Sequence, residues 1–206
     1  MVVRQVCLTI EGIMAGTVER VDKRRHIVET AYALFKQDGF HATGIDRIIA
    51  EADVAKMTMY RNFPSKDDLI VAALDHRAEK FDVMLDRLAA AAGKPAEKIA
   101  VIFDWYERWF ESPDFHGCLF AHAVAEFGEA SHPVFQAAVA QKNNFRRRLR
   151  KILEEIMSRD RAENAATTLL MLIEGATLLA QMGQGKAAMR SARQAARDIM
   201  SSGKRR

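Results

Sequence analysis

Apolar residues recur along this 206-residue chain at spacings of three and four, the repeat of a helix that buries one face. No segment alternates apolar and polar residues as a half-buried strand does. The prolines lie between the apolar periods, where helices are expected to begin or end: Pro64, Pro95, Pro113 and Pro133. The pattern therefore predicts an all-α protein.

The pattern of residues 43–66 predicts two short helices joined by a tight turn, with a third helix beginning directly after them. We expect Thr43 to cap the first helix and Asp46 to lie in its positively polarised first turn. The face that this helix turns toward a core is apolar: Ile45, Ile48, Ile49 and Ala52. Asp53 belongs to the turn, and Pro64 ends the second helix.

In the second helix, Met59 and Phe63 are placed to pack inward, so the remaining side chains lie on the outer surface. These outer residues are Lys56, Met57, Thr58, Tyr60, Arg61 and Asn62. Ser65 and Asp68 have the spacing of a capping box for the next helix. Such a pair of helices is typical of a helix-turn-helix module that reads DNA.

After a long helix over residues 65–92, the pattern predicts helices at about 95–111, 117–128, 133–158, 161–182 and 186–201. Gly93 and Pro95 separate the long helix from the next one. The helix at 161–182 is apolar or small nearly all round, apart from Glu174. We therefore expect it to be covered on two sides.

This pattern divides the chain into an N-terminal three-helix DNA-binding domain at residues 21–76 and a C-terminal helical domain at 77–206. The helix-turn-helix itself occupies about 43–62. Residues 1–20 form an arm that we expect to be disordered. Translation starting at Met14 instead of Met1 would remove most of it.

The net charge of +4 does not by itself predict a nucleic-acid partner, because residues 1–80 carry equal numbers of basic and acidic side chains. Placement is more informative, since Lys56 and Arg61 lie on the second short helix and Lys66 begins the next one. No apolar run reaches the length of a membrane span, and Arg4 and Glu11 interrupt any secretory segment. We expect a cytoplasmic protein without membrane contact.

Four motifs in order resemble the TetR/AcrR family of one-component transcriptional regulators. They are HIVETAYALFKQDGF at 26–40, the helix start at Thr43, MTMYRNF at 57–63 and PSKDDLI at 64–70. The resemblance covers about the first third of the chain at motif level. Two departures are Asp53, where the family usually has glycine, and Ala55, where a serine cap is common. Asp tolerates left-handed geometry better than most residues.

The resemblance implies a homodimeric repressor that binds double-stranded DNA at a palindromic operator. It places DNA contacts at Thr43, Lys56, Met57, Thr58, Tyr60, Asn62 and Lys66, with Arg61 as a further candidate. Lys66 and the hydroxyls of Thr43, Thr58 and Tyr60 suit phosphate oxygens. Lys56, Met57, Asn62 and Arg61 suit base edges. Tyr60 also admits a packing role.

The resemblance also implies an inducer pocket and a dimer interface in the C-terminal domain. Our candidates for a pocket that takes an apolar or aromatic inducer are Trp105, Trp109, Phe120, Phe127 and Glu174. Glu174 is either paired with an arginine or an anchor for the ligand. For the interface we expect two copies of the last two helices to form a four-helix contact, with a seam of small residues on the last helix: Ala188, Ala192, Ala195 and Ile199. The alternative is that this face packs within its own chain.

The cysteines Cys7 and Cys118 do not predict a disulfide in a cytoplasmic protein. His116, Cys118 and His122 match no strong metal-ligand spacing, and Cys118 is more often a small buried residue than a sensor of electrophiles. No phosphate-binding loop, nucleophile elbow or paired carboxylate motif indicates catalysis, so we expect no enzyme, cofactor or metal. The rival hypothesis is a helical small-molecule-binding or metal enzyme with a vestigial DNA-binding domain.

Overall fold

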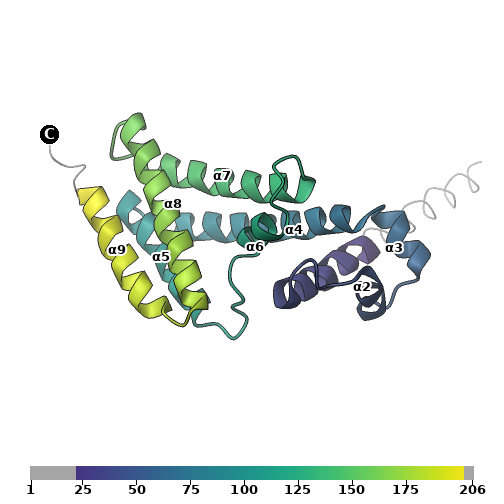
Figure 1. Cartoon of the computed structure of the whole chain (residues 1–206). Coiled ribbons are helices and arrows are strands. Elements are labelled where there is room, and N and C mark those ends of the chain that lie inside the picture. Colours follow the sequence, from purple (N-terminus) through teal and green to yellow (C-terminus); the bar gives the residue numbers. More distant parts are fainter. Residues whose placement is uncertain (1–21, 202–206) are drawn as a thin grey trace, which may run out of the picture. The chain divides into compact units, whose positions relative to one another are not determined.

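The computed structural model describes residues 22–201, and the regular structure in that range is helical (Figure 1). This confirms the all-α expectation. The chain divides into two compact units between His76 and Arg77, the same point at which we expected the DNA-binding domain to end. The expected arm at 1–20 lies outside the described residues. No helix of the described part is long and apolar enough to cross a membrane.

The N-terminal unit contains a helix over residues 22–38, α2 (Ile45–Glu51), α3 (Lys56–Asn62) and the first turns of α4 (Lys66–Ala91). Its core combines side chains from all four helices, each almost fully buried: Ile27, Ala31, Phe35, Ile48, Met59 and Leu69. The first helix ends at Asp38. Gly39 adopts a φ of 87°, and the rings of Phe35 and Phe40 lie 5.2 Å apart.

The start of α2 differs from the expectation, because Gly44 and not Thr43 is the capping residue. Thr43 is completely buried, and its hydroxyl donates to the carbonyl oxygen of Gly39 at 2.7 Å. The side chain thus closes the loop that follows the first helix instead of satisfying amides of α2. The turn itself is as expected, since Asp53 has a φ of 48°.

The junction between α3 and α4 confirms the expected helix stop and capping box. Phe63 is extended just before Pro64, so α3 ends there. The amide of Ser65 donates to Asp68 Oδ2 at 3.0 Å, and the amide of Asp68 donates to Ser65 Oγ at 3.1 Å. This reciprocal pair satisfies two amides that the first turn of α4 leaves unbonded.

The C-terminal unit contains the rest of α4 and α5 (Pro95–Phe110), α6 (Leu119–Glu126), α7 (Pro133–Leu153), α8 (Arg159–Gln181) and α9 (Gly185–Ser201). The expected helices are all present. The main difference is that α7 ends at Leu153 and not near residue 158. A turn over residues 154–156 follows, and Ser158 precedes α8.

The core of this unit lies among α5, α7, α8 and α9, where α5 and α8 contact each other and both contact α7 and α9 (Figure 1). The buried face of α5 consists of Ile99, Ile102, Phe103 and Tyr106, whereas Phe110 is only partly buried. The Phe145 ring of α7 lies 6.3 Å from that of Tyr106. Aromatic packing therefore joins α5 to α7.

The seam that we expected on α9 is buried inside the chain. Ala192 is only 3% exposed and belongs to the core, and Ala188 and Ile199 pack against the same core. Ala195 is half-buried on the same helix. The assignment of Ala188, Ala192, Ala195 and Ile199 to a contact between subunits is therefore wrong for Ala192, whose methyl group is already covered within its own chain.

Helix α8 leaves large apolar side chains uncovered on one face. Met171 is 61% exposed and Leu178 is 60% exposed, and Leu179 and Met182 are also exposed. Gly175 lies between them in sequence, with open space where a Cβ would stand. We expected α8 to be covered on two sides. In the described residues, one of its apolar faces is buried and the other is exposed.

Candidate functional site

Helix α3 is anchored from one side and open on the other. Met59 is fully buried and Phe63, directly after the helix, is 1% exposed, so both side chains are fixed in the core. Met57 is 74% exposed and Tyr60 is 43% exposed. Packing on one face thus sets which side chains α3 presents outward.

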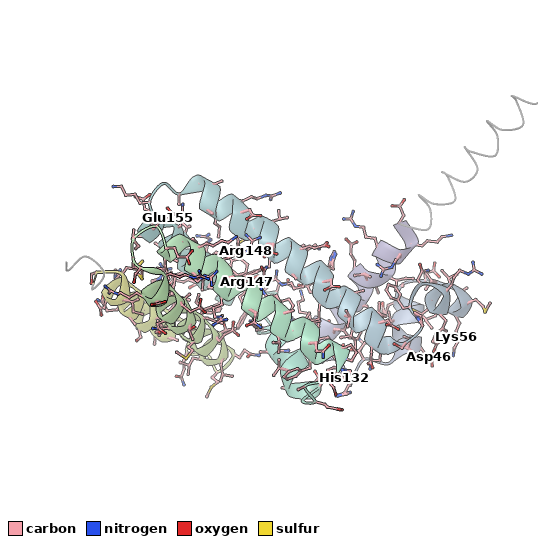
Figure 2. The ribbon with its side chains drawn as sticks, turned by 90° about the horizontal axis from the view of Figure 1, so that it is seen from above. Asp46, Lys56, His132, Arg147, Arg148 and Glu155 are labelled. Atoms are coloured by element: carbon pink, nitrogen blue, oxygen red, sulfur yellow. The ribbon has the colours of Figure 1, made fainter. Side chains whose placement is uncertain are left out.

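The cations of this outer face differ in their local partners. Lys56 Nζ lies 3.2 Å from Asp46 Oδ1 of α2, and both residues are exposed (Figure 2). Lys56 donates a hydrogen bond to Asp46, and this bond and the negative charge of Asp46 raise the pKa of Lys56, so Lys56 is cationic at neutral pH. Arg61 is exposed in the last turn of α3. The outer face of α3 therefore carries positive charge beside one carboxylate.

Two expected DNA contacts are already engaged within the protein. The Thr43 hydroxyl is buried against Gly39, as described above, and cannot meet a phosphate in this conformation. The side-chain amide of Asn62 donates to the carbonyl oxygen of Thr58 at 2.8 Å, and Asn62 Oδ1 is buried. The Asn62 side chain is thus bonded to the backbone of its own helix and does not point at a base edge.

Lys66 is the first residue of α4 and is half-buried there. The amides of a helix start and its partial positive charge favour an anion at this position. A lysine there adds a full charge to the same place. Thr58 is half-buried on α3. Both positions remain compatible with phosphate contact.

Sequence reasoning did not identify two contacts near these residues. One is the pairing of Asp46 with Lys56 across ten positions of the chain. The other is Arg24, whose guanidinium lies 4.7 Å from the centre of the Phe63 ring. The helical spacing of either segment alone carries no signal for such contacts, since both depend on how two helices are turned toward each other.

In the C-terminal unit, Glu174 has a lysine partner and not the arginine that we considered. Lys142 Nζ of α7 donates to Glu174 Oε1 of α8 at 2.6 Å. The same nitrogen lies 3.1 Å from Cys118 Sγ and 5.7 Å from the centre of the Phe120 ring. Three helices thus bring Cys118, Phe120, Lys142 and Glu174 together.

Tyr106 of α5 connects this polar cluster to the aromatic residues. Burial raises the pKa of Tyr106 well above its usual range, and the charges of Glu174 and Cys118 act in the same direction. The rings of Trp105 and Trp109 lie 5.0 Å and 5.8 Å from that of Tyr106. Four of the five expected pocket residues therefore lie around Tyr106 or Lys142.

Phe127 is placed differently, with its ring 4.8 Å from that of His132 in the connection between α6 and α7.

Two hollows of the C-terminal unit are lined by other residues than the expected pocket residues. One, of about 390 Å³, has Leu85, Phe145, Arg147 and Arg148 in its lining, and Figure 2 shows the two arginines on α7. The other, of about 510 Å³, lies between α5 and the α8–α9 connection. The expected inducer pocket stays a prediction.

The residues His116, Cys118 and His122 do not share one partner. Cys118 contacts Lys142, while His122 Nε2 lies 3.2 Å from the amide nitrogen of Gln181. That same amide donates to the His116 carbonyl oxygen at 3.3 Å. Within the described part of the chain, no three His, Cys, Asp or Glu side chains are grouped to hold a metal ion.

Comparison with known proteins places both units in one family. Residues 27–73 match the family described as bacterial regulatory proteins, tetR family. Residues 95–196 match the tetracyclin repressor-like C-terminal domain. Together the two matches extend over most of the described helices.

Individual relatives agree. The chain is 34% identical over 84 residues to the HTH-type transcriptional repressor KstR of Mycolicibacterium smegmatis, an alignment that spans 41% of either chain. It is 29% identical over 161 residues to the HTH-type transcriptional regulator LmrA of Bacillus subtilis, covering 77% of this chain and 86% of that one. The chain thus spans about two fifths of the length of KstR and most of the length of LmrA.

Among solved structures, a TetR-family transcriptional regulator from Streptomyces coelicolor superposes with a TM-score of 0.83 at 28% identity. The superposition covers 90% of this chain and 97% of that one. The family matches, the regulator relatives and this superposition all agree with a helix-turn-helix. The exposed outer face of α3 fits the second helix of such a motif. This chain belongs to the TetR family of transcriptional regulators, with an N-terminal helix-turn-helix domain and a C-terminal helical domain.

Proposed function

We propose that the protein is a homodimeric repressor that binds a palindromic operator and leaves it when a small apolar or aromatic molecule binds the C-terminal unit. The observation that carries the DNA part is the geometry of α3. Its inner face is fixed by Met59 and Phe63, while Lys56, Met57, Tyr60 and Arg61 face outward. A short helix that is rigidly backed and presents cations suits insertion into the major groove.

The revised set of DNA contacts is smaller than the one drawn from sequence. Lys56, Met57 and Arg61 are the candidates for base edges, and Thr58, Tyr60 and Lys66 are those for phosphates. The side chains of Thr43 and Asn62 act inside the protein, where they hold the loop before α2 and the end of α3. Their contribution to DNA binding is therefore indirect.

The uncovered face of α8 supports the dimer. Large apolar side chains grouped on one helix are costly to leave in water, and a second copy that covers them would remove that cost. Gly175 would allow the two helices to approach closely there. We therefore propose that α8, through Met171, Leu178 and Met182, forms the contact between subunits, with the outer face of α9 beside it.

The aromatic and polar residues around Tyr106 support the inducer site. Trp105, Trp109 and Phe120 supply apolar surface, and the Lys142–Glu174 pair supplies polar groups that can orient a ligand. Phe127 is the weakest member of the proposed set, because it packs on His132.

A DNA-binding titration tests this function. Fluorescence anisotropy with the DNA upstream of the protein's own gene should show binding that weakens steeply with salt, because phosphate counterions are released. A scrambled duplex of the same length is the control. Binding of equal strength to both duplexes at every salt concentration would favour an enzyme or binding protein with a vestigial DNA domain.

A further inference from the structure

A carboxylate lies beside the outer face of α3, where a negative charge opposes DNA binding. Asp46 is in the first turn of α2, and its side chain is 78% exposed. Its Oδ1 lies 3.2 Å from Nζ of Lys56, the first residue of α3 (Figure 2). Core packing does not require this charge, because both side chains are exposed. A group that repels every phosphate therefore needs a reason other than the fold.

The Asp46–Lys56 pair presents an acceptor and a donor side by side. Lys56 Nζ bonds Oδ1 of Asp46, and no hydrogen bond reaches Oδ2 in the part of the chain that the structure describes. The lysine ammonium has three N–H donors, of which Asp46 takes one. Both remaining sets of groups are accessible, since the Lys56 side chain is also 65% exposed. The pair can therefore hydrogen-bond further groups without breaking.

The major-groove edge of a G·C base pair has the complementary arrangement. Guanine presents O6 and N7 as acceptors, and cytosine presents its N4 amino group as a donor. O6 and N4 are bonded to each other within the base pair at about 2.9 Å, close to the 3.2 Å between Lys56 Nζ and Asp46 Oδ1. In an A·T pair the amino group lies between two single acceptors, so a lysine meets only one acceptor at a time. The protein pair therefore fits G·C better than A·T.

We propose that Asp46 and Lys56 together read one G·C base pair in each half-site, with Lys56 on guanine O6 and N7 and Asp46 on cytosine N4. The proposal rests on the proposed operator binding and adds Asp46 to the residues that determine its specificity. The pair is exposed, so moving either group toward DNA costs little. The carboxylate gains a donor only at that base pair and is repelled by phosphates elsewhere. Asp46 therefore weakens binding to all DNA, but least at the operator.

The test measures DNA affinity by anisotropy for the parent protein and for Asp46→Ala. The duplexes are the DNA upstream of the protein's own gene, its single-base variants and a scrambled sequence. Asp46→Ala should bind the scrambled duplex severalfold more tightly, because a repelling charge is gone. It should also lose a preference of about tenfold for G·C at one position of the half-site. Asp46→Asn, which keeps an acceptor without the charge, should retain part of that preference.

Two further variants separate base reading from a general effect of charge. Glu51→Ala removes an exposed carboxylate at the other end of α2 and should change affinity for all duplexes by one common factor. Lys56→Ala should lose its preference at the same base pair as Asp46→Ala. A common factor for Asp46→Ala, or loss at a different base pair, would overturn this proposal alone. A parent protein that binds operator and scrambled duplex equally would overturn the proposed function, and this proposal with it.

Discussion

At the scale of single residues, a polar side chain is available for the proposed DNA contact only if it is not already bonded within the protein. Lys56 is exposed and paired only with an exposed carboxylate, so a DNA group can replace that partner at little cost. Thr43 and Asn62 donate to backbone carbonyl oxygens of their own chain, and loss of the Thr43 hydroxyl would leave the Gly39 carbonyl without that donor. Lys56 is therefore open to a DNA contact, whereas the side chains of Thr43 and Asn62 are bonded within the fold.

Lys66→Ala should lower DNA affinity for all sequences and reduce the salt slope by about one unit, because one phosphate contact is lost. Lys56→Ala should instead change the ranking of operator variants. Anisotropy titrations against a panel of single-base variants at several salt concentrations measure both effects. Lys151→Ala, at an exposed position of α7, is the control and should leave both unchanged. Equal losses without altered preference in the two variants would refute the assigned roles.

Thr43→Val should destabilise the folded protein by about 1 kcal/mol, because the Gly39 carbonyl loses its buried donor. Thr43→Ser retains the hydroxyl and should lose less. Denaturant midpoints compare the three proteins, and anisotropy at a temperature where all are folded compares their DNA affinity. A stable Thr43→Val protein with sharply weakened DNA binding would restore Thr43 as a direct contact.

At the scale of helices, α8 and α9 differ in how far the chain covers their apolar faces. The small residues of α9 pack into the chain's own core, and the large apolar residues of α8 remain outside. Both helices have apolar residues at helical spacing, so periodicity alone marks their apolar faces without saying what covers each one.

Leu178→Glu should convert the proposed dimer into monomers, because two copies of the α8 face would bring like charges together in an apolar contact. Light scattering at micromolar concentration measures the mass. Val83→Glu is the matched control, since Val83 is an exposed apolar residue of α4 in the same unit. We expect it to stay dimeric. Ala192→Glu, by contrast, should disrupt folding itself, because Ala192 is buried within its own chain. A dimeric Leu178→Glu protein would place the interface elsewhere.

At the scale of the whole molecule, the proposed repression and induction require that ligand and DNA oppose each other. Linkage demands that an inducer which weakens operator binding must itself bind more weakly when operator is present, by the same factor. The only two tryptophans, Trp105 and Trp109, lie in the C-terminal unit with their rings 5.5 Å apart. Their emission therefore reports on that unit alone.

An apolar or aromatic molecule that releases the DNA should change this tryptophan emission. Operator DNA should then shift the ligand midpoint upward by the coupling energy, typically about 1 to 3 kcal/mol. Titrations with operator and with a scrambled duplex measure the shift. Identical midpoints would show that the site near the tryptophans does not control DNA binding.

The sequence determined those features of the fold that depend on neighbours within about four residues. The helix starts at Ser65 and Pro95, the left-handed Gly39 and Asp53, and the stop before Pro64 all follow from local backbone chemistry. Helix α3 was predicted for the same reason, because its motif and its buried face lie within one short stretch of the chain.

Tertiary structure decided which distant side chains meet. Lys142 reaches Glu174 across 32 positions and Cys118 across 24, and Thr43 turns back to Gly39 instead of capping α2. The rotation of each helix about its own axis sets these contacts, and helical spacing within one segment leaves that rotation open. The covered face of α9 and the uncovered face of α8 were decided in the same way, by which neighbours the packed core placed beside them.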